Sequence, residues 1–167
     1  VIPVSFTTKI EDFVAHNGPK LSYTKTPLGN EIFIKSNDLL FEQGVNDLEI
    51  SVQKWDGIAC FFKLNKKSSI PFDIFAASFY LISRYEEYLP HVKDTHGRFT
   101  AEQSLGYKHQ FLEKPIVDIW AYKFLAVLKE RFPEYEYKKR AYNYISTIDI
   151  DNAFAYKHKS LTRSVGG

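Results

Sequence analysis

The stretch PFDIFAASFYLISRYEEYLP, residues 71–90, decides the fold. Pro71 and Asp73 are typical of a helix start, because proline is tolerated in the first turn and an aspartate side chain accepts hydrogen bonds from free backbone N–H groups. Residues 74–82 are apolar almost all the way round the helix, whereas the residues after them carry charges. We therefore expect a helix that enters the core, emerges polar and ends at Pro90.

Short strands are expected before this helix. Alternating apolar residues predict one hairpin over residues 21–34, with its turn at 27–30, and a second over 48–62, with its turn at Asp56-Gly57. The inner strand of the second hairpin holds Cys60, the only cysteine, which we expect to be a buried structural thiol. An opening strand at residues 2–6 and a helix between Thr7 and Asn17 complete this half.

Helices dominate the second half of the chain. A polar loop at 94–98 leads to a short helix near 101–107, and Pro115 opens a long helix whose apolar residues recur at helical spacing. A last strand is expected from about residue 142 to residue 150. Together these elements predict an α+β (mixed α/β) fold with a central, mostly antiparallel sheet and helices packed on it.

Composition excludes several classes of partner. The 167 residues are 44% hydrophobic, which suits a globular domain, and the net charge of +2 gives no field that would attract nucleic acid or an anionic membrane. No window approaches the ~18 apolar residues of a membrane-spanning helix, and the N-terminus lacks a secretory pattern. We therefore expect no nucleic-acid partner, no membrane partner and a cytoplasmic location. Because the chain contains no methionine, we also expect it to be a piece of a longer protein.

The motif Thr147-Ile148-Asp149-Ile150-Asp151 carries the strongest chemical signal. On a strand, Asp149 and Asp151 would share one face at a spacing of ~6.5–7 Å. Two such carboxylates can divide the work of binding a divalent cation and activating a water molecule. The alternative is that Asp151 caps a following helix and Asp149 is a solvated strand end.

This motif resembles the first motif of the NodB-homology polysaccharide deacetylases, carbohydrate esterase family 4, in the variant with one residue between the two acids. Residues 71–88 and the segment His96-Gly97-Arg98-Phe99 are similar to an N-terminal domain of unknown function that precedes such a deacetylase domain in Bacteroidetes proteins. The second resemblance covers about residues 1–140. It implies an accessory domain at residues 1–141 and the start of a truncated catalytic domain at 142–167.

The resemblance also implies a chemistry. In such deacetylases, which are distorted β/α barrels, the first acid is the base and the second binds a divalent metal (Zn²⁺ or similar) with two histidines of a later H-x-x-x-H motif. Carried over, Asp149 would be the catalytic base and Asp151 a metal ligand. No two of the five histidines here are four residues apart, so we expect this chain to be inactive and metal-free. Its expected partners are the catalytic domain of the same polypeptide and a glycan substrate.

Two polar clusters offer other hypotheses. Arg84, Glu86 and Glu87 lie where the core helix emerges, and they form either an acid/base site or a structural ion pair. His96 and Arg98 either bind an anionic or sugar ligand or dock Arg98 onto the helix acids. If Glu86, Glu87, His96 and Arg98 met in one cleft, the chain would be a self-sufficient hydrolase. The remaining alternative is a non-enzymatic carbohydrate- or protein-binding module, for which exposed tyrosines near residues 135–142 could serve as stacking surfaces.

Overall fold

The computed structural model describes residues 4–137, 139 and 141–149, and the chain divides into two units at residues 137 and 138. The first unit has an α+β fold, as expected. Its helices are α1 (Ile10–Ala15), α2 (Ile74–Ile82), α3 (Leu105–Lys108) and α4 (Ile116–Arg131), and its 3₁₀ turns are η1 (Asp38–Leu40), η2 (Tyr85–Tyr88) and η3 (Ala101–Gln103). Its strands are β1 (Leu21–Thr24), β2 (Ile32–Lys35), β3 (Gln53–Trp55) and β4 (Ile58–Cys60).

The predicted central antiparallel sheet is wrong: the described residues form two separate two-stranded sheets. The first of them, β1–β2, is parallel, with Leu21 opposite Ile32, where a hairpin was expected. Because the two strands are parallel, the chain must run back along β1 before β2 begins. Residues 25–31 are long enough for this, since seven residues reach about 23–25 Å when extended. The far edge of β2 pairs with no strand. Instead the Ser69 hydroxyl accepts from the Phe33 N–H at 3.0 Å, and the Ser69 N–H donates to the Phe33 carbonyl at 2.7 Å.

The second sheet, β3–β4, is the predicted antiparallel hairpin. Its two-residue turn places Asp56 at φ 47° and Gly57 at φ 80°, which matches the right-handed twist of the strands. The hairpin begins at Gln53, later than expected. Cys60 is fully buried, and burial raises the pKa of its thiol to about 11, so the prediction of an inert structural thiol is confirmed.

Helix α2 begins where the sequence predicts and ends seven residues earlier than expected. Asp73 caps it, accepting from the N–H groups of Phe75 and Ala76 at 3.0 Å each. At the other end Arg84 has the left-handed φ of 55°, which an α-helix cannot continue through. The chain therefore leaves α2 at Ile82 and forms the separate turn η2.

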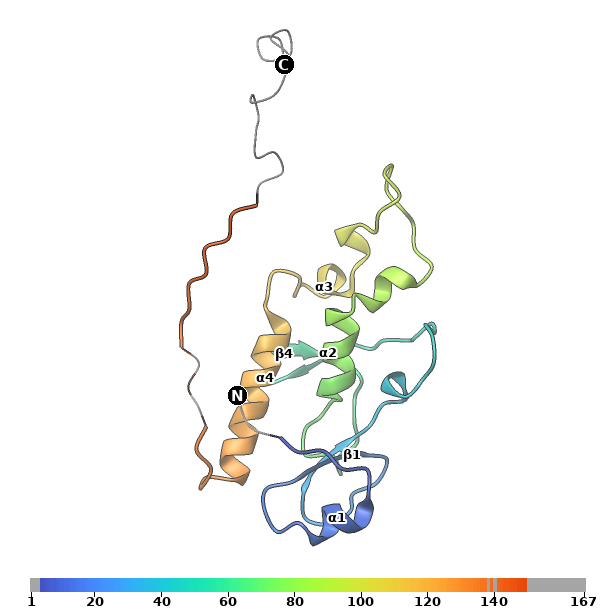
Figure 1. Cartoon of the computed structure of the whole chain (residues 1–167). Coiled ribbons are helices and arrows are strands. Elements are labelled where there is room, and N and C mark those ends of the chain that lie inside the picture. Colours follow the sequence, from blue (N-terminus) through green and yellow to red (C-terminus); the bar gives the residue numbers. More distant parts are fainter. Residues whose placement is uncertain (1–3, 138, 140, 150–167) are drawn as a thin grey trace, which may run out of the picture. The chain divides into compact units, whose positions relative to one another are not determined.

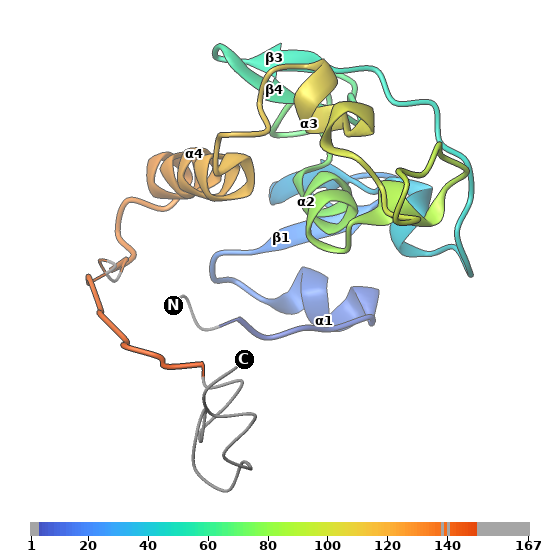
Figure 2. The same ribbon diagram turned by 90° about the horizontal axis from the view of Figure 1, so that it is seen from above.

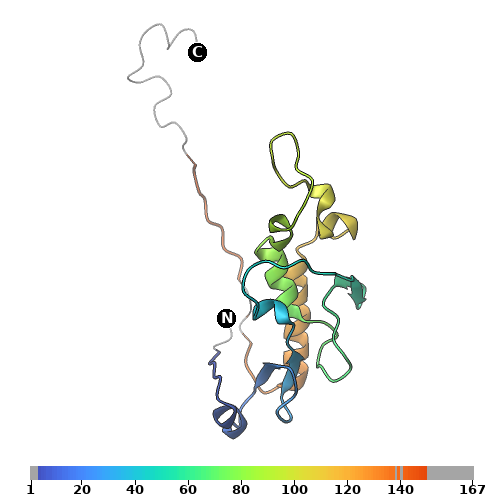
Figure 3. The ribbon, with the colours of Figure 1, turned by 90° about the vertical axis from the view of Figure 1, so that its right-hand side faces the viewer.

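The core lies between α2 and α4, which run side by side (Figure 1 and Figure 3). Figure 2 shows the β3–β4 hairpin on one side of α2 and β1 on the other. Trp120 of α4 is fully buried and contacts the rings of Phe61 and Phe72 at centroid distances of 5.7 and 5.1 Å. Its indole N–H donates to the Ala59 carbonyl at 2.8 Å, which ties α4 to the hairpin. The predicted long helix is thus confirmed; within its apolar stripe Trp120 is buried, and Val117, Phe124 and Leu128 are partly buried.

Two expected strands do not form. Residues 4–9 contain no strand, although α1 follows them as predicted. Residues 141–149 also contain none, and Tyr142 and Ile148 are 89% and 83% exposed. Alternating apolar residues make a strand only when a neighbouring strand pairs with their backbone, and the pattern alone does not supply that neighbour. No helix in the described part of the chain is both long and apolar enough to cross a membrane.

Candidate functional site

The acidic cluster after α2 serves local structure. The guanidinium of Arg84 pairs with the carboxylate of Glu87. Glu86 points elsewhere and accepts from the Leu105 N–H at 2.8 Å, which holds the start of α3. Burial raises the pKa of Glu86, and this outweighs the opposing effects of the Leu105 amide and of Lys108. This cluster was predicted to be either an acid/base site or a structural ion pair, and its geometry is that of a structural ion pair.

The polar loop before η3 is organised around Asp94. Its carboxylate accepts from the N–H groups of His96 and Arg98 at 2.8 and 2.9 Å and pairs with the Arg98 side chain at 3.1 Å. These hydrogen bonds lower the pKa of Asp94, the Arg98 amide contributing most. Gly97 adopts φ 77°, which completes the tight turn. Arg98 therefore docks onto Asp94 of its own loop.

Among the described residues, the two polar clusters of the first unit do not bond to each other. No hydrogen bond or ion pair among residues 84–98 joins Glu86 or Glu87 to His96 or Arg98. Asp149 is exposed in the second unit, and Asp151 lies outside the described residues. Nowhere in the described ranges do three or more His, Cys, Asp or Glu side chains gather as a metal ion requires, so these residues do not fit a zinc site by themselves.

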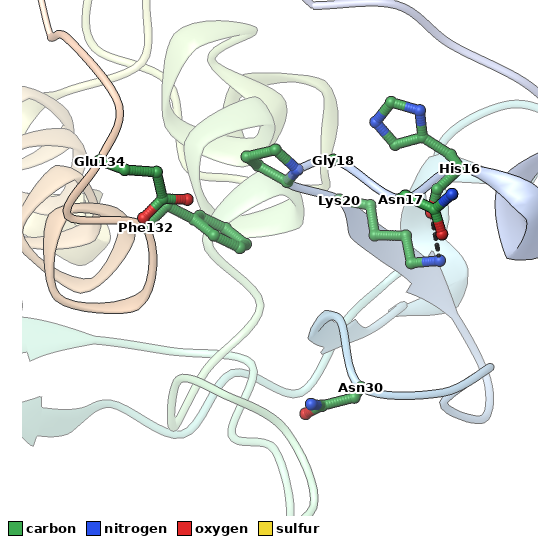
Figure 4. A pocket seen from close by; sticks show the side chains of 8 residues that line it. His16, Asn17, Gly18, Lys20, Asn30, Phe132 and Glu134 are labelled. Atoms are coloured by element: carbon green, nitrogen blue, oxygen red, sulfur yellow. Dashed lines mark hydrogen bonds between the residues drawn. The ribbon is translucent and has the colours of Figure 1, made fainter.

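A groove in the first unit gathers polar side chains that the sequence did not single out. It has a volume of about 290 Å³ and is lined by residues 16–20, Asn30, Phe132 and Glu134. Figure 4 shows Phe132 and Glu134 across the groove from His16, Asn17 and Lys20. The volume is near the lower limit of small-molecule sites, and the lining combines one aromatic ring with several hydrogen-bonding groups.

The C-terminal end of α1 forms one wall of the groove. The Lys20 ammonium donates to the carbonyl oxygens of Phe13, Val14 and His16 at 3.1, 3.1 and 2.8 Å. These contacts use all three of its N–H donors. Next to it, Gly18 leaves room for the His16 ring, since a Cβ at residue 18 would lie 2.7 Å from His16 Nε2.

Asn30 is held in place from two sides. Arg131, at the end of α4, donates to the carbonyl and the side-chain oxygen of Asn30 at 3.0 and 2.6 Å. The neighbouring Glu31 is buried and accepts from Ser22 at 2.6 Å and from the Leu28 N–H at 2.8 Å. Burial alone would raise the pKa of Glu31, but these hydrogen bonds lower it below its usual value. The amide N–H₂ of Asn30 remains available to a ligand.

The opposite wall follows the end of α4. The Tyr137 hydroxyl lies 3.0 Å from the Leu128 carbonyl oxygen and 3.3 Å from that of Phe132. This tyrosine thus satisfies backbone acceptors at the helix end and fixes the segment that carries Phe132 and Glu134. Sequence reasoning missed the groove because its residues come from three distant segments. The available signal was that all three are turns, marked by Gly18-Pro19, Gly29 and Pro133.

The first unit is thus a small α+β domain with a polar groove on its surface. The chain belongs to a family of unknown function, DUF7033, whose profile matches residues 1–133. Comparison with the curated proteins and with the solved structures gives no match.

Proposed function

We propose that residues 1–141 are an accessory domain of a metal-dependent polysaccharide deacetylase, which hydrolyses N- or O-acetyl groups on a glycan, and that the catalytic domain begins at residue 142. The observation that carries this proposal is the order of two features in one chain. A domain of the DUF7033 family, matched over residues 1–133, is followed at residues 147–151 by the acid motif ending in Asp149 and Asp151. The first unit itself is proposed to have no catalytic role.

The use of the polar residues in the first unit supports a non-catalytic role. Glu87, Asp94 and Arg98 are engaged in hydrogen bonds or ion pairs within their own turns, and Glu86 is engaged with the Leu105 N–H at the start of α3. A catalytic acid or base must instead be free to exchange a proton with a substrate. These contacts favour an accessory domain over a self-sufficient hydrolase.

An apolar face on α2 supports a role in packing against another domain. Phe75, Phe79 and Ile82 are 37%, 43% and 71% exposed, and their spacing places them on one side of the helix. The ring of Tyr23 joins Phe75 to the exposed Phe41, at centroid distances of 5.2 and 5.9 Å. Contiguous exposed apolar side chains of this kind mark interaction surfaces. We propose that the catalytic domain of the same polypeptide covers them.

Acetate release tests the proposed activity. The chain of residues 1–167 and the complete gene product, both supplied with Zn²⁺, are incubated with acetylated chitooligosaccharides and acetylated xylan. We expect acetate from the complete gene product alone, and we expect its Asp149→Asn variant to lose at least about 100-fold in rate. Activity in residues 1–167, or none in the metal-loaded complete product on any of these glycans, would overturn the proposal.

Thermal unfolding tests the apolar face. We expect Ile82→Ser to change the stability of residues 1–167 by less than about 0.5 kcal/mol, because the side chain is exposed there. In the complete gene product the same change should lower the melting temperature by about 2–4 °C or more, since a covered isoleucine contributes about 1.5 kcal/mol or more. Val92→Ser, at a residue 77% exposed in the polar loop, is the matched control. Equal effects of Ile82→Ser in both proteins would show that no domain covers this face.

A further inference from the structure

We infer that the groove between α1, the β1–β2 connection and the end of α4 binds a neutral sugar unit of a glycan chain. The groove is the 290 Å³ site lined by His16, Asn17, Asn30, Phe132 and Glu134 (Figure 4). The inference deepens the proposed function, on which it rests for the choice of glycan probes. It assigns to the accessory domain a place where the polysaccharide is held.

The free hydrogen-bonding groups of the groove suit hydroxyl groups. A sugar hydroxyl both donates and accepts, so it is best met by a mixture of acceptors and donors. Glu134 lines the groove and offers a carboxylate acceptor, and the amides of Asn17 and Asn30 offer N–H donors. His16 also belongs to the lining, and its Nε2 atom lies against Gly18. The half-buried ring of Phe132 provides an apolar surface for the C–H face of a sugar ring.

The charges of the groove argue against an anionic ligand. Lys20, the one lysine in its lining, has its three donors committed to backbone carbonyl oxygens and has none left for a phosphate or carboxylate. Arg131 behind the groove directs its Nη2 group to Asn30. The Glu134 carboxylate would repel an anion at close range. A neutral polyhydroxylated ligand needs no free cation in the groove and is not repelled by the Glu134 carboxylate.

The ligand groups are held in position before any ligand arrives. Asn30 is fixed by Arg131, and the Phe132 segment is fixed by Tyr137. Side chains that are already ordered lose less entropy on binding. This preorganisation favours a site that holds a ligand over a chance depression in the surface.

Titration of residues 1–167 with uncharged oligosaccharides tests the inference. The probes are N,N′,N″-triacetylchitotriose, cellotriose and xylotriose, followed by amide shifts in ¹⁵N-resolved NMR spectra. We expect at least one probe to shift the amide signals of residues 16–18, Lys20 and Asn30 saturably. Glu134→Gln should weaken that binding roughly three- to tenfold, the worth of one hydrogen bond, and Asn17→Ala should weaken it to a similar extent.

The matched control is Glu136→Gln, the same change at an exposed glutamate two residues further along that does not line the groove. It should leave the affinity unchanged. No saturable shift with any probe, equal effects of Glu134→Gln and Glu136→Gln, or competition by inorganic phosphate would overturn the inference. If residues 1–167 bind no sugar while the complete gene product releases acetate, only this inference fails. If they bind sugar in the groove while the complete product releases none, only the proposed activity fails.

Discussion

Asp73→Ala is expected to lower the free energy of unfolding of the first unit by about 3–5 kcal/mol. Asp73 is fully buried, and its carboxylate accepts four hydrogen bonds. Two come from the N–H groups at the start of α2, one from the Tyr23 hydroxyl at 2.7 Å and one from the Asn37 N–H at 2.7 Å. Alanine would remove the helix cap and leave the other donors buried without an acceptor. Urea unfolding followed by circular dichroism measures the loss.

Asp73→Asn keeps the prediction testable if the alanine variant does not fold. Asparagine still caps α2 through its oxygen, but its N–H₂ group then faces the Asn37 N–H, so an intermediate loss of about 1–3 kcal/mol is expected. Tyr23→Phe, which removes one of the four donors, should lose about 1 kcal/mol. An alanine variant as stable as the wild type would show that Asp73 does not hold β1, η1 and α2 together.

Trp120→Ala is expected to lower the free energy of unfolding by about 3–5 kcal/mol, the cost of leaving a large cavity in a packed core. Trp120 is fully buried between Phe61 and Phe72. Its loss also leaves the Ala59 carbonyl without its 2.8 Å hydrogen bond. The change should be seen in urea unfolding and in the loss of near-ultraviolet dichroism from the aromatic core.

Two variants act as controls for Trp120. Tyr122→Ala removes an aromatic ring that is 53% exposed on the same helix, and it should cost much less, about 1 kcal/mol or below. Trp120→Phe keeps most of the ring contact and should fall between the two alanine variants. If Tyr122→Ala and Trp120→Ala were equally damaging, burial of the Trp120 ring would not be the cause of the loss, because alanine itself favours the helix.

Local signals in the sequence predicted the elements that depend on neighbouring residues. The cap at Asp73, the turn at Asp56-Gly57 and the helix opened by Pro115 are each encoded within a few positions, and all appear in the structure. The parallel pairing of β1 with β2 could not be predicted in this way. The turn residues between them indicate only that the chain reverses locally. The other edge of β2 is held by Ser69, which is 36 residues away from Phe33 and equally invisible to local signals.

The candidate site was harder to predict than the fold. Glu86 and Glu87 looked like paired acids, yet one bonds the Leu105 backbone and the other bonds Arg84, because neighbouring side chains on a helical turn diverge. The groove residues carry no motif at all. They meet only because Arg131 bridges about a hundred positions to reach Asn30, and no spacing in the sequence encodes that contact. The roles of Asp149 and Asp151 stay predictions.

Because the hydrogen bond from Arg131 to Asn30 joins residues far apart in the sequence, the groove exists only when the chain is folded. In the unfolded chain the residues that line the groove are far apart. A ligand of the groove would therefore bind the native protein and have no affinity for the denatured ensemble. Occupancy would then shift the folding equilibrium by mass action, adding about 2.7 kcal/mol at a hundredfold excess over the dissociation constant. A polysaccharide bound in this groove would therefore stabilise the folded form of the domain that binds it.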